Sequence, residues 1–267
     1  MSTVTSDILK PLDRIQRRGF TMGKVFRDWV RLMLYALQRD DAKYLDVMGR
    51  YPNDRDKGER EADLFKEAFW LLHDQMAKDR EMGAEPKEYL GGIYMEIVGN
   101  YSAQGMGQYF TPQPVCDMMA QLTIPNTEDE ALRVADPACG SGRLLHSAAK
   151  LLPTEAHFTG IDLDSICAHM AALNLCFFNM NGVIIHGNAL SMKYYNGWII
   201  KRSMLGGKIR EMSAEEVEGY RELRGKALKE AAKSRKKPGK VVKSTVSEDS
   251  EGFEKVTVNH QQQLALF

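Results

Sequence analysis

Short apolar runs alternate with helical patterns between residues 106 and 200, and this alternation restricts the fold of the 267-residue chain more than any other feature. The apolar runs are Leu132–Ala135, Phe158–Ile161 and Val183–Ile185. The helical patterns that flank them are Val115–Leu122, Leu144–Leu152 and Ile166–Met180. Short buried strands joined by helices are typical of βαβ units with a parallel sheet. We therefore predict an α/β core at 106–200.

The rest of the chain divides into three further regions. Residues 1–105 carry apolar residues at helical spacing without a strand pattern, which predicts a helical N-terminal region with Trp29 and Trp70 in its core. Residues 201–254 are polar and contain a charged helical stretch from Ala214 to about Ser234, followed by a linker. Residues 255–267 are apolar again, and we expect either a strand packed on the core or a docking tail.

Composition excludes several classes of protein. Hydrophobic residues make up 43% of the chain and acids and bases number 36 each, which is a globular and electrically balanced mixture. No run approaches the length of about 18 apolar residues that a transmembrane helix needs. The N-terminus lacks the basic-then-apolar layout of a signal peptide, so we expect a cytoplasmic protein. The four cysteines lack metal-site spacing, and we expect reduced, mostly buried thiols and no metal.

A glycine-containing turn follows the first predicted strand. Residues 136–142 read Asp-Pro-Ala-Cys-Gly-Ser-Gly and precede a predicted helix. Gly140 and Gly142 permit the torsions and close ligand approach that a sharp strand-to-helix turn requires. Such a turn lies at the carboxyl edge of a parallel sheet, where open α/β folds bind ligands. Leu145 stands where a dinucleotide-binding loop needs its third glycine, and no Walker lysine follows. A tight turn without a ligand is the alternative.

Two further segments favour a ligand site. Asp162 ends the second predicted strand, where an acid accepts hydrogen bonds from ribose hydroxyls in such folds. Upstream of the core, Tyr109 and Phe110 precede Thr111, which we predict to cap a helix that begins at Pro112. The two aromatic rings would then form the wall of a pocket. Taken singly, Asp162 also fits a helix cap, and the two rings also fit a hydrophobic core.

Together these segments resemble the amino-methyltransferases of DNA, most closely the modification (M) subunit of type I restriction-modification systems. Residues 107–112, Gly-Gln-Tyr-Phe-Thr-Pro, resemble motif X of that family, and 136–142 resemble motif I. Gly160-Ile161-Asp162 is similar to motif II, and residues 187–190, Gly-Asn-Ala-Leu, are similar to motif III. The helix around Ala171–Leu175 also resembles the family. The resemblance covers roughly residues 60–190, and the pairing of motif X with motif I is its most specific part.

The resemblance implies a Rossmann-like S-adenosylmethionine-dependent methyltransferase core, whole or truncated, behind a helical N-terminal region. It implies that the glycine loop lies under the methionine portion of the cofactor and that residues 109–112 close over it. Asp162 would hold the ribose, and Asn188 would meet the adenine. The implied cofactor-binding residues are Gln108, Tyr109, Phe110, Thr111, Pro112, Asp136, Ala138, Gly140, Ser141, Gly142, Asp162 and Asn188.

One family motif is missing. The family polarises the adenine amine with an (Asn/Asp)-Pro-Pro-(Tyr/Phe) segment after its fourth strand, and none of the nine prolines here is adjacent to another. A degenerate substitute is one explanation, with Asn259 accepting an amine hydrogen and Tyr194, Tyr195 or Trp198 stacking on the base. A partner subunit that donates the missing half is the second. The third is a protein that binds cofactor or DNA without chemistry. The catalytic residues are therefore unknown.

Two charged or apolar segments suggest macromolecular partners. Between Arg224 and Lys243 nine bases face the single acid Glu230, which fits either DNA phosphates or a solvated linker helix. The last five residues resemble the peptide that bacterial replication and repair proteins insert into the sliding clamp. In that interpretation the residues that enter the clamp are Gln263, Leu264, Leu266 and Phe267. The sequence thus predicts a DNA adenine N6-methyltransferase, alone or in a modification complex, or else a noncatalytic module tethered to the clamp.

Overall fold

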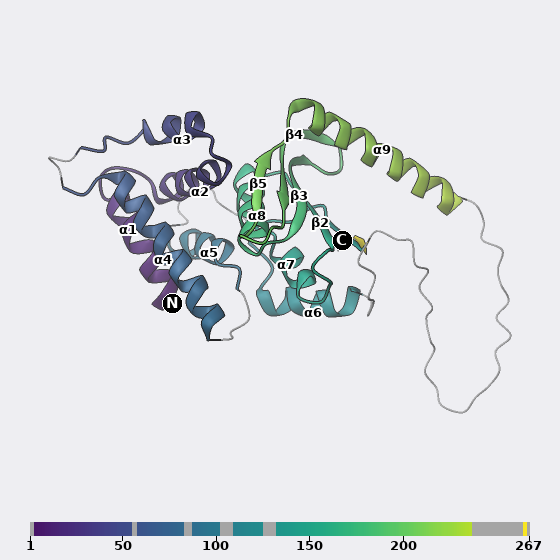
Figure 1. The fold of residues 1–267 in the computed structure, drawn as a ribbon, viewed down its shortest axis with the longest axis horizontal. Helices are drawn as coiled ribbons and strands as arrows, with labels where there is room; N and C mark the ends of the chain where they lie inside the picture. The colour runs from purple at the N-terminus through teal and green to yellow at the C-terminus, as the bar shows by residue number, and fades with distance from the viewer. Residues whose placement is uncertain are drawn as a thin grey trace.

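A computed structural model describes residues 3–54, 58–82, 87–101, 109–124, 132–236 and 264–265. It has a helical region at one end and a mixed α/β core at the other (Figure 1). The fold class predicted from the alternating pattern is therefore confirmed. Within these described ranges no helix combines the length and apolarity that crossing a membrane requires.

Among its described residues, the N-terminal region forms five helices: α1 (Thr3–Gln16), α2 (Met22–Gln38), α3 (Asp41–Met48), α4 (Glu61–Glu81) and α5 (Leu90–Tyr101). Helix α1 packs along α4, and α2 and α5 contact helix α8 of the core. Trp29 is buried with a relative exposure of 1%, as predicted. The prediction for Trp70 is wrong, because its side chain is 56% exposed on the outer side of α4. Helical spacing alone does not distinguish the inner face of α4 from its outer edge.

In the part of the chain that the structure describes, six strands make one sheet: β1 (Arg133–Asp136), β2 (His157–Asp162), β3 (Asn181–Asn188), β4 (Lys193–Lys201), β5 (Lys208–Glu211) and β6 (Leu264–Ala265). Their spatial order is β5-β4-β3-β2-β1-β6. The first three are parallel and match the three apolar runs predicted as strands. Asp136 pairs with Gly160, and Asp162 pairs with His186, so each strand extends two residues beyond its preceding neighbour before it ends at the same edge of the sheet.

The next two strands depart from the alternating pattern. Strand β4 returns antiparallel to β3 through a tight turn, and β5 pairs antiparallel with β4. Strand β5 lies in the polar region from which no strand was predicted, and Ile209 is its buried residue. Trp198 on β4 is 1% exposed and packs edge-on against His169, so the suggestion that it stacks on a base is wrong.

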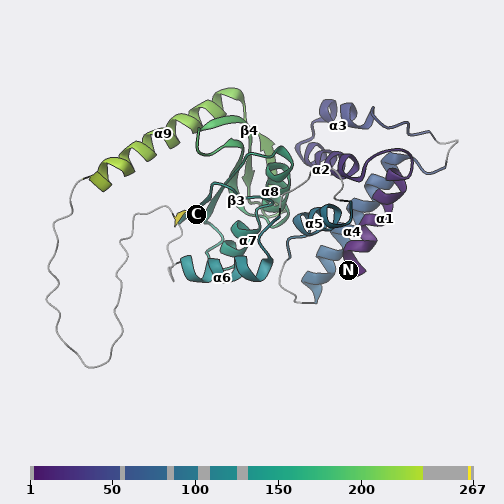
Figure 2. The ribbon, with the colours of Figure 1, turned by 180° about the vertical axis from the view of Figure 1, so that it is seen from behind.

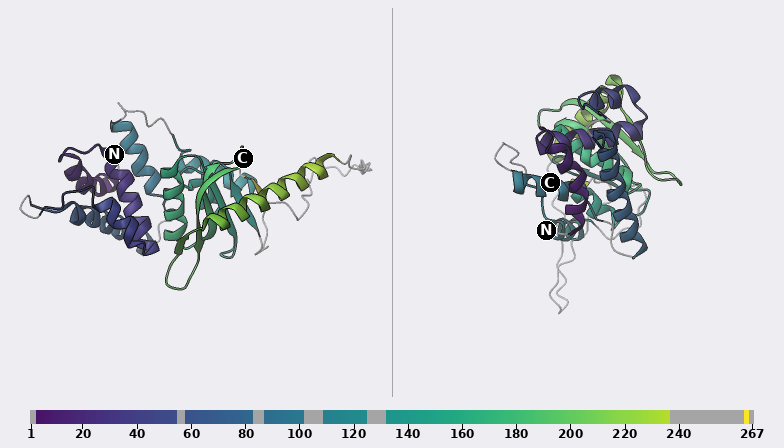
Figure 3. Two further views of the ribbon diagram at one scale, coloured as in Figure 1. Left: turned by 90° about the horizontal axis from the view of Figure 1, so that it is seen from above. Right: turned by 90° about the vertical axis from the view of Figure 1, so that its left-hand side faces the viewer.

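The remaining helices are α6 (Gln113–Thr123), α7 (Arg143–Ala149), α8 (Ser165–Phe177) and α9 (Ala214–Lys236). Helix α8 lies between the sheet and helices α2 and α5, and its residues Ile166–Cys176 are all buried. Helix α7 packs against α6 and β1. Helix α9 contacts β4 and then extends away from the sheet, as Figures 2 and 3 show. All four cysteines are buried thiols that form no disulfide, as predicted.

Two residues of the candidate clamp peptide belong to the sheet. Leu264 and Ala265 pair in parallel with Val134 and Ala135 on the outer edge of β1. This pairing favours the expected strand over the docking tail, because backbone groups held in a ladder are not available to a partner. Gln263, Leu266 and Phe267 lie outside the described residues.

Candidate functional site

The carboxyl ends of β1, β2 and β3 bring three predicted site residues to one edge of the sheet. Asp136 ends β1, Asp162 ends β2 and Asn188 ends β3. The strands are parallel neighbours, so the three side chains follow one another along that edge. This is the edge at which open α/β sheets bind ligands.

The glycine loop makes its turn with two left-handed residues. Gly140 has a φ of +54° and Gly142 a φ of +82°, values that L side chains rarely adopt. Asp136 Oδ1 accepts a hydrogen bond from the Ala138 amide at 3.0 Å, which starts the turn. Gly142 begins helix α7 against α8, where an added Cβ would lie 3.3 Å from the Ala171 Cβ. The predicted role of both glycines in the backbone turn is therefore confirmed.

Asp162 ties the second strand to the loop. Its Oδ2 accepts a hydrogen bond from the Gly140 amide at 2.8 Å, and its Oδ1 accepts one from Asp164 at 2.9 Å. The cap of helix α8 is Asp164, whose Oδ1 accepts the Ile166 amide, so Asp162 does not act as that cap. Burial raises the pKa of Asp162, and burial raises that of Asp136 to about 6. Both carboxyls thus lie in a poorly solvated setting that favours a nearby cation.

Phe110 covers the loop from the N-terminal side. A Cβ added to Gly140 would lie 3.0 Å from Phe110 Cδ1, and the Phe110 ring is 5.2 Å from that of Tyr94 on α5. Tyr109 is 77% exposed, so only one of the two predicted aromatic residues packs on the loop. Gln108 lies outside the described residues.

The predicted cap of the following helix is wrong by one residue. Helix α6 starts at Gln113 with Pro112 as its cap residue, and no side chain caps it. The Thr111 carbonyl instead accepts a hydrogen bond from Arg143 Nη1 at 3.0 Å. A tertiary contact from α7 therefore fixes this segment, where the sequence suggested a local cap.

The other predicted site residues differ in their surroundings. Asn188 Oδ1 accepts hydrogen bonds from the Leu190 and Ser191 amides, both at 2.9 Å, so the amide nitrogen is the group left to face a ligand. Ala138 is exposed, whereas Ser141 is 1% exposed and points into the protein. Ser141 therefore contributes to the loop through its backbone. Asn259 lies outside the described residues.

Sequence reasoning missed a buried polar network behind the loop. The Glu88 carboxylate accepts hydrogen bonds from Arg143 Nη2 at 3.0 Å and from Asn174 Nδ2 at 2.7 Å. Asn174 Nδ2 also donates to the Ser141 carbonyl at 2.8 Å. An asparagine inside the apolar run of α8 was the available signal, because a buried amide needs partners. Nothing in the sequence pointed from it to Glu88, 86 residues away.

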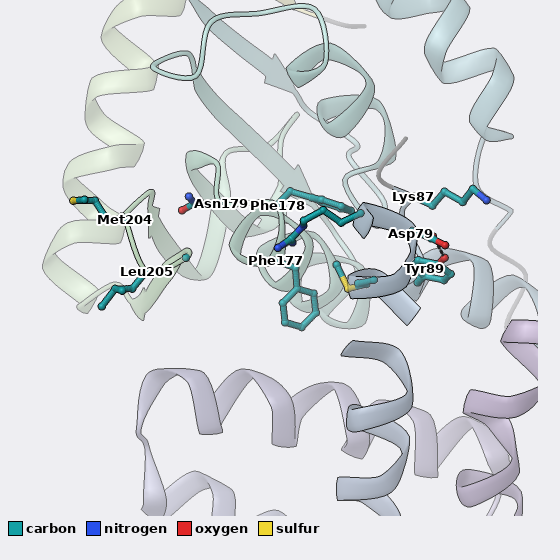
Figure 4. A pocket seen from close by; sticks show the side chains of 11 residues that line it. Asp79, Lys87, Tyr89, Phe177, Phe178, Asn179, Met204 and Leu205 are labelled. Atoms are coloured by element: carbon teal, nitrogen blue, oxygen red, sulfur yellow. Dashed lines mark hydrogen bonds between the residues drawn. The ribbon is translucent and has the colours of Figure 1, made fainter. Parts of the chain in front are cut away.

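A larger cavity lies away from this edge. It has a volume of about 760 Å³ between the end of α4, the end of α8 and the β4–β5 connection (Figure 4). Phe177 and Phe178 contribute to its lining, and Asp79 there accepts a hydrogen bond from Tyr89. Helix α8 connects the parallel strands β2 and β3, so it runs back across the sheet. Its C-terminal end, and with it this cavity, therefore lies at the edge where the parallel strands begin, opposite the candidate site. The size of a cavity therefore does not identify the candidate site here.

The edge residues fit the chemistry of S-adenosylmethionine. Its ribose hydroxyls donate hydrogen bonds and its sulfonium and ammonium groups are cations, which two carboxylates at this edge match. Phe110 lies so close to Gly140 that a Cβ at this position would press against its ring, so only glycine fits at this point of the loop. Leu163, 60% exposed directly after Asp162, adds an apolar surface for a flat base.

A family model matches the core of the chain. Residues 85–204 match the family described as N-6 DNA Methylase. The matched segment contains the glycine loop, Asp162 and Asn188. No curated protein matches the chain.

Three solved structures are similar to the chain at low identity. A putative class I S-adenosylmethionine-dependent methyltransferase from Listeria monocytogenes is 13% identical with a TM-score of 0.43, over 71% of this chain and 55% of its own. The type I restriction-modification methyltransferase subunit from Streptococcus thermophilus is 17% identical with a TM-score of 0.38, over 70% and 58%. The modification subunit of a putative type I restriction enzyme from Vibrio vulnificus YJ016 is 20% identical with a TM-score of 0.35, over 49% and 28%. The chain thus spans little more than half the length of the first two.

Proposed function

We propose that the chain is an S-adenosylmethionine-dependent DNA adenine N6-methyltransferase, acting alone or as a subunit of a modification complex. The observation that carries the proposal is the meeting of Asp136, Gly140 and Asp162 at one sheet edge under Phe110. This arrangement lies within the segment that matches the N6 DNA methylase family. The proposal includes DNA as substrate and, as in restriction-modification, further subunits as partners.

The cofactor would supply an activated methyl group, and the chain's own residues would bind and orient it. Asp162 would accept the ribose hydroxyls through lone pairs left beside its two backbone hydrogen bonds. Asn188 would donate to the adenine through its amide nitrogen. The loop backbone from Ala138 to Gly142 would lie along the methionine portion, with Asp136 providing negative charge. Tyr109, Phe110, Thr111 and Pro112 would close the site, with Gln108 before them.

Methyl transfer to an exocyclic amine also needs hydrogen-bond acceptors for that amine, since positioning and polarisation provide most of the rate. The chain lacks an Asn-Pro-Pro-Tyr-type segment. Tyr195, half exposed beside the His186 ring, is the aromatic residue on β4 that remains open for stacking. We favour donation of the missing acceptors by another polypeptide, and Asn259 is the candidate within this chain.

Two measurements on the purified chain test the proposal. Isothermal titration with S-adenosylmethionine should show binding to the wild type and at least tenfold weaker binding to Asp162→Ala. Incubation with unmodified DNA and cofactor labelled on its methyl group should transfer label to adenine, with co-purifying polypeptides added back if needed. Binding without transfer in every combination would favour the noncatalytic alternative, and absence of binding would refute the cofactor site.

The basic half of α9 supports DNA as the partner. A hollow of about 280 Å³ lies between the turn after β3 and α9, lined in part by Ser191, Arg221, Lys226 and Lys229. Ser191 donates to Asn188, so this hollow adjoins the candidate site. Cations beside a site that acts on DNA can neutralise backbone phosphates. We therefore propose that DNA crosses α9 on its way to the sheet edge.

Neutralising two of these lysines should weaken DNA binding. For Lys226→Gln/Lys229→Gln we expect the slope of log affinity against log salt to become shallower by up to about two, because each phosphate contact contributes about 0.9. Fluorescence anisotropy with a labelled duplex measures this slope. Lys66→Gln/Lys78→Gln on α4 changes the net charge equally and should leave the slope unchanged. Equal slopes for both pairs would contradict a DNA contact on α9.

A further inference from the structure

Glu88 joins four segments of the protein through one buried carboxylate. Its side chain is 0% exposed and lies just before helix α5. Oε1 accepts hydrogen bonds from the Gly91 amide at 2.5 Å and from Asn174 on α8 at 2.7 Å. Oε2 accepts from the Arg143 Nε and Nη2 on α7, at 3.2 and 3.0 Å. Arg143 in turn reaches the segment before α6.

The two side-chain partners of Glu88 hold the candidate site from both sides. Asn174 donates to the carbonyl of Ser141, which lies between the two left-handed glycines of the loop. Arg143 donates to the carbonyl of Thr111, which directly follows the Phe110 that covers Gly140. The same carboxylate therefore orients both the loop and the segment that closes over it.

The start of α5 is pressed against the loop from behind. A Cβ added to Gly91 would lie 2.4 Å from Ser141 Oγ and 2.6 Å from Glu88 Oε2. Glycine at this position allows Glu88 to approach the loop closely enough for its hydrogen bonds. A binding loop held by packed, hydrogen-bonded neighbours loses little freedom when a ligand arrives, which favours affinity.

We propose that Glu88 is a positioning residue that fixes the glycine loop and the Phe110 segment in the geometry for cofactor binding, acting through Arg143 and Asn174. The inference rests on the proposed function. It assigns to the helical N-terminal region, beyond folding, a part in binding the cofactor. The Arg143 side chain is only 13% exposed, and removing the charge of Glu88 would leave its guanidinium without a carboxylate partner. A buried charge without its partner moves or draws in water.

The test compares Glu88→Gln with a matched control in the full chain. Glu61 is also a buried carboxylate at a helix start, and it accepts from Arg18 at 2.9 Å and from the Asn53 amide at 2.8 Å. We expect both Glu88→Gln and Glu61→Gln to lower the melting temperature. Only Glu88→Gln should weaken S-adenosylmethionine binding, by at least tenfold in isothermal titration. Without cofactor, Glu88→Gln should also speed hydrogen exchange at 136–145 and 109–111, whereas Glu61→Gln should not.

A double variant separates positioning from stability. In Glu88→Gln/Arg143→Met the unpaired charge is gone, so we expect thermal stability to recover relative to Glu88→Gln. Cofactor binding should remain at least tenfold weaker than in the wild type, because the Thr111 carbonyl has lost its donor, Arg143. Recovery of affinity together with stability, or unchanged affinity in Glu88→Gln, would overturn the inference while leaving the proposed function intact. A wild-type chain that fails to bind the cofactor would refute both.

Discussion

Gly140→Val is expected to weaken S-adenosylmethionine binding by at least 100-fold and to lower the free energy of unfolding by about 2–4 kcal/mol. A β-branched residue at a φ of +54° is strained by roughly 1–3 kcal/mol. Its Cβ would also lie 3.0 Å from the Phe110 ring, so the loop or the ring must shift. A loop displaced from the Asp162 carboxylate loses the hydrogen bond from the Gly140 amide. Isothermal titration and thermal unfolding measure the two effects.

Gly19→Val is the matched control for that variant. Gly19 has a φ of +102° and no heavy atom within 4 Å of an added Cβ, so its substitution adds backbone strain without a contact. It lies in the turn between α1 and α2, away from the sheet edge. We expect it to lower the melting temperature and to leave cofactor affinity unchanged. A Gly140→Val protein that binds the cofactor as tightly as Gly19→Val does would show that the glycine loop is not the cofactor site.

The parts of the fold that could be predicted are those encoded by contiguous residues. The three parallel strands appear as apolar runs, because both faces of a parallel strand are covered. The loop at 136–142 could be predicted because a strand-to-helix turn with φ above zero selects glycine locally. Asp162 could be predicted because the end of a strand fixes which edge it occupies.

The parts that could not be predicted depend on contacts between distant segments. Glu88 reaches Asn174 across 86 residues, and no local pattern records that pairing. Strand β5 is short and carries one buried residue, Ile209, so its pairing with β4 rather than its own pattern determines it. Trp70 was expected in the core and is exposed, whereas Trp198 was expected to be open for stacking and is buried. Both outcomes depend on contacts with distant segments. Which face of a helix or strand is covered depends on what packs there.

The second large prediction concerns the effect of the Asp136 carboxyl on the stability of the protein, with Asp117 as a contrasting acid. Burial raises the pKa of Asp136 from 3.8 to about 6, so between those values the folded state holds more protons than the unfolded state. Stability from this group therefore falls as pH rises through that window and stays reduced above it. Asp136→Asn should raise the free energy of unfolding at pH 7.5 by about 1–3 kcal/mol, since one pKa unit corresponds to about 1.4 kcal/mol. Urea unfolding at pH 7.5 and pH 4 measures the change, which should disappear at pH 4.

Asp117→Asn should act in the opposite direction. Although burial opposes it, hydrogen bonds from Ser147, Gln113 and Lys150 lower the pKa of Asp117. Its ionised form therefore stabilises the folded state above the pKa of the unfolded chain, and that contribution is lost as pH falls through the folded value. At pH 7.5 this variant should unfold at lower urea than the wild type. A loss of stability in both variants would contradict the effect of burial on Asp136.

A protein keeps a destabilising buried acid when the charge serves a ligand, because stability and binding then make opposite demands on the residue. S-adenosylmethionine is a cation at its sulfonium and ammonium groups, so ionised Asp136 would bind it more tightly than the protonated form. Wild-type affinity should accordingly fall below pH 6, the pKa of this group, by up to tenfold per pH unit. Asp136→Asn should bind at least tenfold more weakly at pH 7.5 and lose most of this pH dependence. A variant that gains stability and keeps full affinity would show that the charge at the end of β1 does not face the cofactor.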